Sequence, residues 1–167
     1  MMEGTKEADL AAQLGLQPHP EGGFFVETFR SPMRVTLPDG RIRSASTAIY
    51  FLLPSGTFSA LHRVSADEVW HYYDGAPLEL TTITPQGVLH KVTLGRNLFL
   101  GHTPQYVVPA GVWQGGHPLK SEESGYTLVG CTVAPGFDFE DFEMPERAVI
   151  VRLFPQHAAV IQKLTRS

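Results

Sequence analysis

Hydrophobic and polar positions along the chain follow two different periods. Near the N-terminus, Leu10 and Leu14 lie four positions apart and acidic residues fill the early turns. With Thr5 before this stretch and Gly15 after it, the pattern predicts a short amphipathic helix. The middle of the chain consists of short runs of β-branched and aromatic residues that end at Pro, Asp and Gly. A helical pattern returns after Glu146, where a proline suits the first turn of a further helix.

Eight segments in the middle of the chain have the composition of strands. They cover residues 23–29, 46–53, 57–64, 68–73, 78–84, 89–94, 105–108 and 126–133. Turn signals such as Pro-Asp-Gly at 38–40 and Pro-Ser-Gly at 54–56 predict antiparallel strands that curl into a barrel or jelly roll. Gly-Gly-His at 115–117 is interpreted as an exposed loop without the strand-to-helix setting that phosphate binding needs.

The length of 167 residues suits one domain with a proper hydrophobic core. We divide it into an N-terminal helix over 1–16, a barrel over 17–143 and a C-terminal helical segment over 144–167. With 13 basic and 17 acidic residues there is no sequence-wide basic field, so nucleic acid is not an expected partner. A single cysteine, Cys131, excludes an intramolecular disulfide and fits a reducing cytoplasm. Because no run of about 18 apolar residues occurs, we expect no membrane partner.

A histidine and a glutamate stand out on two successive predicted strands. By the period of two, His62 shares a strand face with Val64, and Glu68 shares one with Trp70. We therefore expect His62 and Glu68 to face one interior. Imidazole and carboxylate suit iron, manganese, nickel or zinc, although two ligands are too few to establish a metal site.

The same region resembles a known superfamily. Gly56, His62, Glu68 and Gly75 have the spacing of the first cupin motif, with Val64 where its second histidine stands. Pro-Ala-Gly at 109–111 resembles the second motif, and Gln114 occupies the position of its last histidine. Longer segments are similar to a functionally unassigned cupin family of small proteins; they are residues 19–25, 46–53, 67–75, 104–114 and 128–142.

The resemblance implies an all-β fold, the double-stranded β-helix of the cupin jelly-roll barrel, with a short N-terminal helix and C-terminal helices. It also implies a homodimer and a small-molecule pocket at the barrel mouth. Cupins include dioxygenases, decarboxylases, isomerases, sugar epimerases and non-catalytic binders, so the fold alone does not name a reaction.

Two of the four usual metal ligands of a cupin are replaced in this chain. We therefore expect either no cofactor or a weakly bound divalent metal held by His62, Glu68 and Gln114. His71 can supply a further donor only if a bulge intervenes, because its parity relative to Glu68 points it to the opposite face. The interpretation favoured for His71 is an outer-face or interface histidine.

Without a metal, His62 and Glu68 form an acid–base pair. This favours an isomerase or epimerase-like enzyme acting on a polar metabolite or a carbohydrate derivative, in which Tyr50 or Tyr72 supplies an acid, as a tyrosine does in the sugar epimerases it resembles. The predicted substrate-binding residues are Glu21, Glu27, Arg30, Ser59, Arg63, Trp70, Gln105, Trp113 and Gln114.

Two alternatives stay open. In the first, the protein is a non-catalytic ligand-binding protein or sensor, and His62 and Glu68 merely hydrogen-bond to each other. In the second, it is a metal-dependent dioxygenase or decarboxylase with a degenerate metal site. Val64 and Gln114 argue against this hypothesis, because they replace two histidine ligands.

Overall fold

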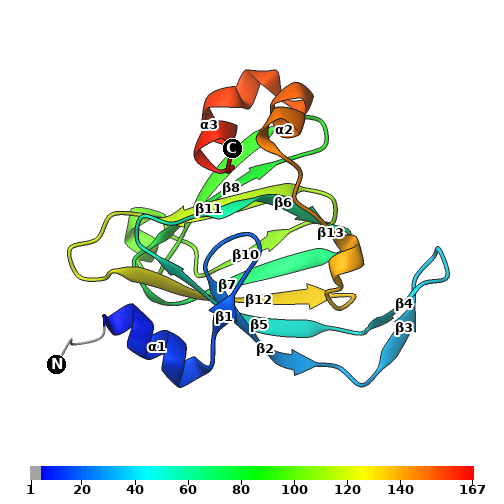
Figure 1. The fold of residues 1–167 in the computed structure, drawn as a ribbon, viewed down its shortest axis with the longest axis horizontal. Helices are drawn as coiled ribbons and strands as arrows, with labels where there is room; N and C mark the ends of the chain where they lie inside the picture. Colours follow the sequence, from blue (N-terminus) through cyan, green and yellow to red (C-terminus); the bar gives the residue numbers. More distant parts are fainter. Residues whose placement is uncertain (1–4) are drawn as a thin grey trace.

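Antiparallel strands form two facing β-sheets, as the punctuated pattern predicted (Figure 1). The computed structural model describes residues 5–167. The first sheet contains, in spatial order, β1 (Gln17–Pro18), β2 (Phe24–Arg30), β5 (Thr47–Pro54), β12 (Tyr126–Ala134), β7 (Asp67–Gly75) and β10 (Gln105–Val108). The second contains β13 (Phe142–Glu143), β6 (Ser59–Val64), β11 (Trp113–Pro118), β8 (Leu78–Ile83) and β9 (Leu89–Leu94). β3 (Arg34–Thr36) and β4 (Ile42–Ser44) pair in a hairpin that projects from the barrel.

Helices occupy both ends of the described chain. α1 (Lys6–Leu14) begins after Thr5, whose side chain accepts a hydrogen bond from the Ala8 N–H, and ends at Gly15, which has a φ of 68°. The first four residues of the helical segment predicted over 1–16 lie outside the described residues. α2 (Arg147–Leu153) and α3 (Ala158–Lys163) lie at the C-terminal end, joined by the 3-10 turn η3 (Pro155–His157). Within residues 5–167, no helix combines the length and apolar character needed to span a membrane.

The two larger of three apolar clusters in the described chain hold these layers together. One lies between the sheets and is built from inward-facing residues such as Phe51, Trp70 and Val129, none of which is exposed. In the other, Ile150 of α2 and Ile161 of α3 pack against the second sheet. The two C-terminal helices therefore cover the outer face of that sheet and leave the interior between the sheets to the first cluster.

The expected loop at 115–117 is instead part of a buried strand, β11. This strand lies between β6 and β8, and a Cβ at Gly115 would come 2.9 Å from the Ser59 carbonyl oxygen. At Gly116 a Cβ would come 2.9 Å from the Glu79 carbonyl oxygen. The prediction was wrong because close backbone packing selects glycine here, and glycine is also the common residue of loops.

Candidate functional site

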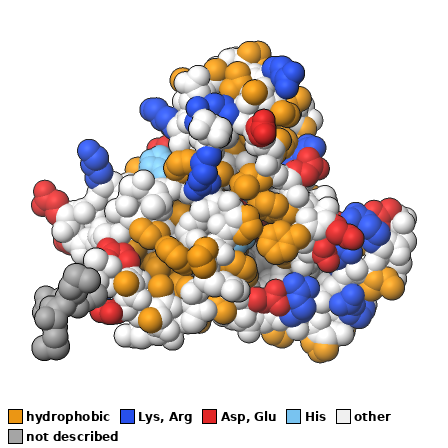
Figure 2. Space-filling model, in the orientation of Figure 1, with side chains coloured by type: hydrophobic (Ala, Val, Ile, Leu, Met, Phe, Trp, Pro, Cys, Tyr) orange, Lys and Arg blue, Asp and Glu red, His pale blue; other side chains and the backbone are white. Residues whose placement is uncertain are grey.

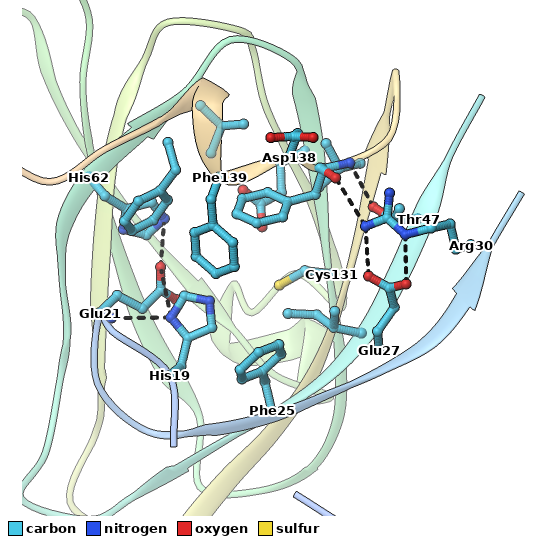
Figure 3. Close-up of a pocket in the computed structure, with 16 residues that line it drawn as sticks. His19, Glu21, Phe25, Glu27, Arg30, Thr47, His62, Cys131, Asp138 and Phe139 are labelled. Atoms are coloured by element: carbon cyan, nitrogen blue, oxygen red, sulfur yellow. Dashed lines mark hydrogen bonds and ion pairs between the residues drawn. The ribbon is translucent and has the colours of Figure 1, made fainter. Parts of the chain in front are cut away.

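A cavity of about 290 Å³ lies between the two sheets (Figure 3). Its volume is close to the lower end of the range of small-molecule sites, about 300–1,000 Å³. The titratable side chains that line it are His19, Glu21, Glu27, Arg30, His62, Glu68, Cys131 and Asp138. Most of the remaining lining is apolar: Phe25, Ile49, Val64, Val133, Phe137, Phe139 and Phe142. The cavity thus combines an apolar wall with a small set of acids and bases.

A buried ion pair joins His62 of β6 to Glu21. Nε2 of His62 lies 2.9 Å from Oε2 of Glu21, and Nδ1 lies 2.7 Å from the Ala60 carbonyl oxygen. A carbonyl oxygen only accepts hydrogen bonds, so Nδ1 carries a proton, and an ionised Glu21 requires a second proton on Nε2. Burial alone would lower the pKa of His62, but the charge and hydrogen bond of Glu21 outweigh it and raise this pKa to about 9. His62 is therefore an imidazolium whose two N–H groups are both engaged.

The turn before β2 places Glu21 against this histidine. Gly22 and Gly23 have φ angles of 112° and 70°, which glycine adopts without strain and which let the chain turn sharply into the barrel. Burial raises the pKa of Glu21, but the charge of His62 and its hydrogen bond have the opposite effect and leave this pKa below its ordinary value. Glu21 is consequently ionised in spite of its burial.

His19 is a second histidine of the site, and it is neutral. Its Nδ1 accepts a hydrogen bond of 3.1 Å from the Glu21 backbone N–H, and burial lowers its pKa. The ring packs edge-on against Phe25 at 4.6 Å between centroids. Because Nδ1 accepts, the proton is on Nε2, which makes no hydrogen bond to any of the described residues. Sequence reasoning missed His19; its signal was the concentration of polar residues in the segment that also supplied Glu21.

Glu68 of β7 is a second buried carboxyl group, and its pKa is shifted in the opposite direction from that of Glu21. Nε1 of Trp70 donates to Oε1 of Gln114 at 2.7 Å, and Nε2 of Gln114 donates to Oε2 of Glu68 at 2.7 Å. Because an indole N–H only donates, these two hydrogen bonds fix the orientation of the Gln114 amide. Burial raises the pKa of Glu68 and outweighs the charge of His62, which lowers it; the charge of Glu21 adds to the rise. Glu68 therefore retains a proton at a higher pH than an ordinary glutamate.

Two carboxyl groups with opposite pKa shifts thus share one cavity. Glu21 is held ionised by His62, whereas Glu68 faces the same space without a basic group within 4 Å among the described residues. Such divergence separates an acid from a base in many active sites. The arrangement can hold a proton at Glu68 and a donor N–H at His19 next to a bound molecule.

The rim of the cavity carries a further ion pair. Arg30 donates two hydrogen bonds of 2.8 Å to Glu27, and a third of 3.1 Å to the Phe137 carbonyl oxygen (Figure 3). Both charged side chains are more than one-third exposed, so they lie at the opening. Phe139 projects into the cavity between this rim and the buried histidines.

Sequence and structure comparisons agree on the family. Residues 8–145 match the family model described as Cupin superfamily (DUF985). The chain belongs to this cupin family. A solved structure titled a hypothetical protein from Leishmania major is 37% identical, with a TM-score of 0.91 over 96% of this chain and 98% of that one. Protein SO0799 from Shewanella oneidensis is 39% identical, with a TM-score of 0.87 over 99% of each chain.

A curated relative carries no assigned reaction either. The uncharacterized protein YML079W of Saccharomyces cerevisiae is 34% identical over 136 residues, which is 74% of this chain and 67% of that protein. The comparisons confirm both the family resemblance and the predicted cupin jelly roll with helices at its ends. The function of this cupin must therefore be argued from its cavity.

Five of the predicted site residues line the cavity: His62, Glu68, Glu21, Glu27 and Arg30. Trp70 and Gln114 do not line it; they lie behind Glu68 and form the hydrogen-bonded chain described above. Ser59, also predicted to bind substrate, is buried in β6 and is not part of the cavity wall.

The predicted acids Tyr50 and Tyr72 do not reach the cavity. Alternation along β5 turns its neighbours Ile49 and Phe51 inward, so Tyr50 points outward and stacks edge-on against Tyr73. Tyr72 packs against the apolar cluster between the sheets, and its hydroxyl donates to the Gly75 carbonyl oxygen. The structure therefore offers neither tyrosine as a proton donor to a cavity ligand.

Three other predicted substrate contacts also lie elsewhere. Trp113 packs beneath the C-terminal helices, and the Arg63 guanidinium lies 4.6 Å from its ring centroid. Arg63 also pairs with Glu143 at 2.8 Å. Gln105 contacts His71 at 3.2 Å, and His71 in turn contacts Thr132, away from the cavity. The parity argument for His71 is consistent with this placement.

The donor set of this cupin does not fit the metal that its superfamily implies. Both nitrogens of His62 are engaged, Val64 replaces a second imidazole, and the Gln114 amide oxygen accepts from Trp70. Gln114 lies beside both His62 and Glu68 but turns its N–H, not its oxygen, toward Glu68, so it does not complete the expected ligand set of His62, Glu68 and Gln114. In residues 5–167, no group of three His, Cys, Asp or Glu side chains is arranged to hold a metal ion.

Proposed function

We propose that this cupin binds a small, partly apolar molecule and moves a proton on it, as an isomerase or epimerase does. The observation that carries the proposal is the pair of buried carboxyl groups, Glu21 and Glu68, whose pKa values are driven in opposite directions within one apolar-walled cavity. A polar metabolite or carbohydrate derivative with a carbonyl group suits such a site.

In this proposal Glu68 is the group that moves the proton. Its raised pKa makes the ionised form a stronger base than an ordinary glutamate and makes the acid form persist to higher pH. Glu68 takes a proton from the carbon next to the carbonyl, and the electron pair moves onto the carbonyl oxygen. The free Nε2–H of His19 donates to that oxygen, and Glu68 then returns the proton to a carbon atom.

His62 has a different role from the one predicted from the sequence. It was expected to be half of an acid–base pair with Glu68, but its two N–H groups bind Glu21 and the Ala60 carbonyl oxygen. It therefore keeps Glu21 ionised and fixes its position. The direct hydrogen bond between His62 and Glu68 that the binding alternative assumed is not formed among the described residues, since Glu68 accepts from Gln114.

One observation favours the alternative of a non-catalytic binder. The tyrosine acid of the epimerase-like hypothesis is missing from the cavity, because Tyr50 and Tyr72 lie outside it. In a binder, the apolar wall and a few fixed polar groups suffice for recognition. The metal-dependent dioxygenase or decarboxylase gains no support from the donor set.

Hydrogen exchange with solvent separates these two functions. Native mass spectrometry first identifies any molecule retained by the purified protein; where none is retained, a panel of hydroxyketones, aminoketones and aldoses is used. Each compound is incubated in D2O with the wild type, with Glu68→Gln and with the exposed control Glu122→Gln, and its C–H signals are followed by NMR. The proposal expects exchange next to the carbonyl with the wild type and the control, and a loss of about 100-fold or more with Glu68→Gln.

A bound compound whose C–H signals stay unchanged with the wild-type protein would instead support the binder. Exchange that persists with Glu68→Gln would overturn the role of Glu68. The homodimer implied by the resemblance stays a prediction, and the same mass spectrum counts the subunits. The cytoplasmic location also stays a prediction.

A further inference from the structure

The positive charges that line the cavity are all neutralised by neighbouring carboxylates. His62 is paired with Glu21 at 2.9 Å, and Arg30 is held by both oxygens of Glu27 at 2.8 Å. Pairs of this kind have little net charge to offer a ligand, and releasing either cation would leave a carboxylate without its partner. An anionic ligand therefore finds no free cation on this wall among the described residues.

Two carboxyl groups of the lining remain without a basic partner. Glu68 is buried, 7% exposed, and accepts a hydrogen bond of 2.7 Å from the Gln114 amide. Asp138 accepts a hydrogen bond of 2.9 Å from the Glu140 backbone N–H and has no ion-pair partner within 4 Å among the described residues. The cavity thus has one carboxyl group without an ion-pair partner at its buried end and another at its rim.

Four phenylalanine rings line the same cavity as these two groups. Phe137 and Phe139 meet edge-on at 4.9 Å between centroids, and Phe142 lies 5.9 Å from Phe139. Phe25 lines the opposite side, against His19 (Figure 3). The faces of aromatic rings attract cations, and cages of rings combined with a carboxylate are a common device for binding organic ammonium groups.

The segment that carries these rings is firmly fixed. Asp141, which lies within it, binds Arg43 of β4 at 2.9 Å and Arg41 at 2.6 Å, and the Phe137 N–H donates to the Thr47 hydroxyl at 2.9 Å. Figure 2 shows basic and acidic side chains gathered over the projecting β3–β4 hairpin, beside a field of hydrophobic side chains in the middle of this face. Because the rings are held in place, little conformational entropy is lost when a ligand packs against them.

We propose that the ligand of this cavity is a small organic cation, a protonated amine with an apolar portion. Its ammonium group pairs with Glu68, and its carbon atoms pack against the phenylalanines. The inference rests on the proposed function, because it names the ligand class of the same cavity. Within that function, the substrate is a carbonyl compound that also carries an amine on the carbon that loses the proton. Its ammonium group favours the ionised form of Glu68, and that carboxylate then acts as the base on the same carbon.

Three probes with the same ring test this inference: benzylamine, benzyl alcohol and benzoate. Their dissociation constants are measured by calorimetry in phosphate buffer, which contains no competing amine, at pH 6.5 and pH 8. Benzylamine is expected to bind about tenfold more tightly than benzyl alcohol, the effect of one charge-assisted hydrogen bond, and benzoate is expected not to bind. Because Glu68 pairs with the ammonium group only in its ionised form, the affinity for benzylamine should not be lower at pH 8 than at pH 6.5.

Two variants and one matched control identify the groups responsible. Glu68→Gln keeps the size of the side chain and can still accept from Gln114, and it should bring the amine and alcohol affinities to within about threefold. Phe139→Leu changes a half-exposed ring and should weaken benzylamine by about threefold, with a smaller effect on the alcohol. Glu122→Gln removes an equal charge from the exposed surface and should change neither affinity.

The inference is overturned if benzoate binds as well as benzylamine, or if Glu68→Gln keeps the preference for the amine. It is also overturned if none of the probes binds at 10 mM, a concentration that corresponds to a binding free energy of about 3 kcal/mol. Failure of this inference is separable from failure of the proposed function. Proton exchange on a neutral or anionic compound, without a preference for benzylamine, would remove the inference alone. A preference for benzylamine without exchange on any aminoketone would leave an amine-binding protein and remove the enzymatic proposal.

Discussion

Replacing Glu21 with Gln tests the buried ion pair at the centre of the site. Gln keeps the shape of the side chain and can donate to an unprotonated Nε2 of His62, so the variant loses the charge but can retain a hydrogen bond. In the wild type, the pKa of His62 rises from 6.5 to about 9, which corresponds to about 3 kcal/mol of stabilisation. Removing one partner of a buried pair typically costs about 3–5 kcal/mol, which agrees with this value.

The loss of folding stability caused by Glu21→Gln depends on pH. The two pKa shifts determine whether this loss grows or shrinks as the pH rises. A raised folded pKa for His62 gives stability that is fully present below pH 6.5 and is lost as the pH rises through about 9. A lowered folded pKa for Glu21 gives stability that is present above its ordinary value of 4.5 and is lost on acidification through the folded value. The free energy of unfolding of the wild type should therefore exceed that of Glu21→Gln by about 3 kcal/mol at pH 6 and by less than about 1 kcal/mol at pH 10.

Urea unfolding followed by tryptophan fluorescence measures this difference, since Trp70 and Trp113 are both buried. The wild type, Glu21→Gln and the exposed control Glu122→Gln are compared at pH 6, 7.5 and 10 and at one protein concentration. The control should follow the wild type at each pH. A difference between the wild type and Glu21→Gln that stays constant from pH 6 to pH 10 would refute the assignment of a charged pair.

Three further predictions concern the surroundings of the site. Gln114→Ala leaves Trp70 Nε1 and Glu68 without their partner and should lower the free energy of unfolding by about 2–4 kcal/mol in urea; an unchanged value would contradict the hydrogen-bonded chain. Gly23→Ala places a Cβ 2.6 Å from the Leu52 carbonyl oxygen at a φ of 70°, so it should cost about 1–3 kcal/mol more than Gly40→Ala, which has open space around it; equal melting temperatures would refute this. Dialysis against a chelator should leave the melting temperature within about 1 °C, whereas a larger fall, with metal detected by elemental analysis, would contradict the donor-set argument.

Some of the site could be predicted because it depends on local alternation. The period of two was enough to turn His62 and Glu68 toward one interior, and both line the cavity. It could not supply the partner of His62, because Glu21 comes from an irregular turn that is distant in sequence and has no periodic signal. The carboxyl group actually paired with His62 is therefore the one predicted only as a substrate contact.

The outer parts of the site show the same limit. Trp113 was expected to contact a ligand, but it faces the C-terminal helices. Their packing against β11 joins segments that are distant in sequence, so no local pattern predicts it. Tyr50 belongs to a strand whose residues are hydrophobic on both faces, so alternation of polarity does not say which face is inward. The strand β11 itself was missed because Gly115 and Gly116 are selected by backbone contact with neighbouring strands.

The most direct test of the account is an NMR titration of the cavity's own ionisable groups. Protein labelled with ¹³C at the glutamate carboxyl groups and ¹⁵N in the histidine rings is titrated from pH 3 to pH 10, and Glu21→Gln and Glu68→Gln assign the signals. We expect Glu21 to ionise at a lower pH than Glu68, and His62 to carry protons on both nitrogens at pH 7 while His19 carries one. Glutamates that titrate together or in the reverse order, or a neutral His62 at pH 7, would contradict it.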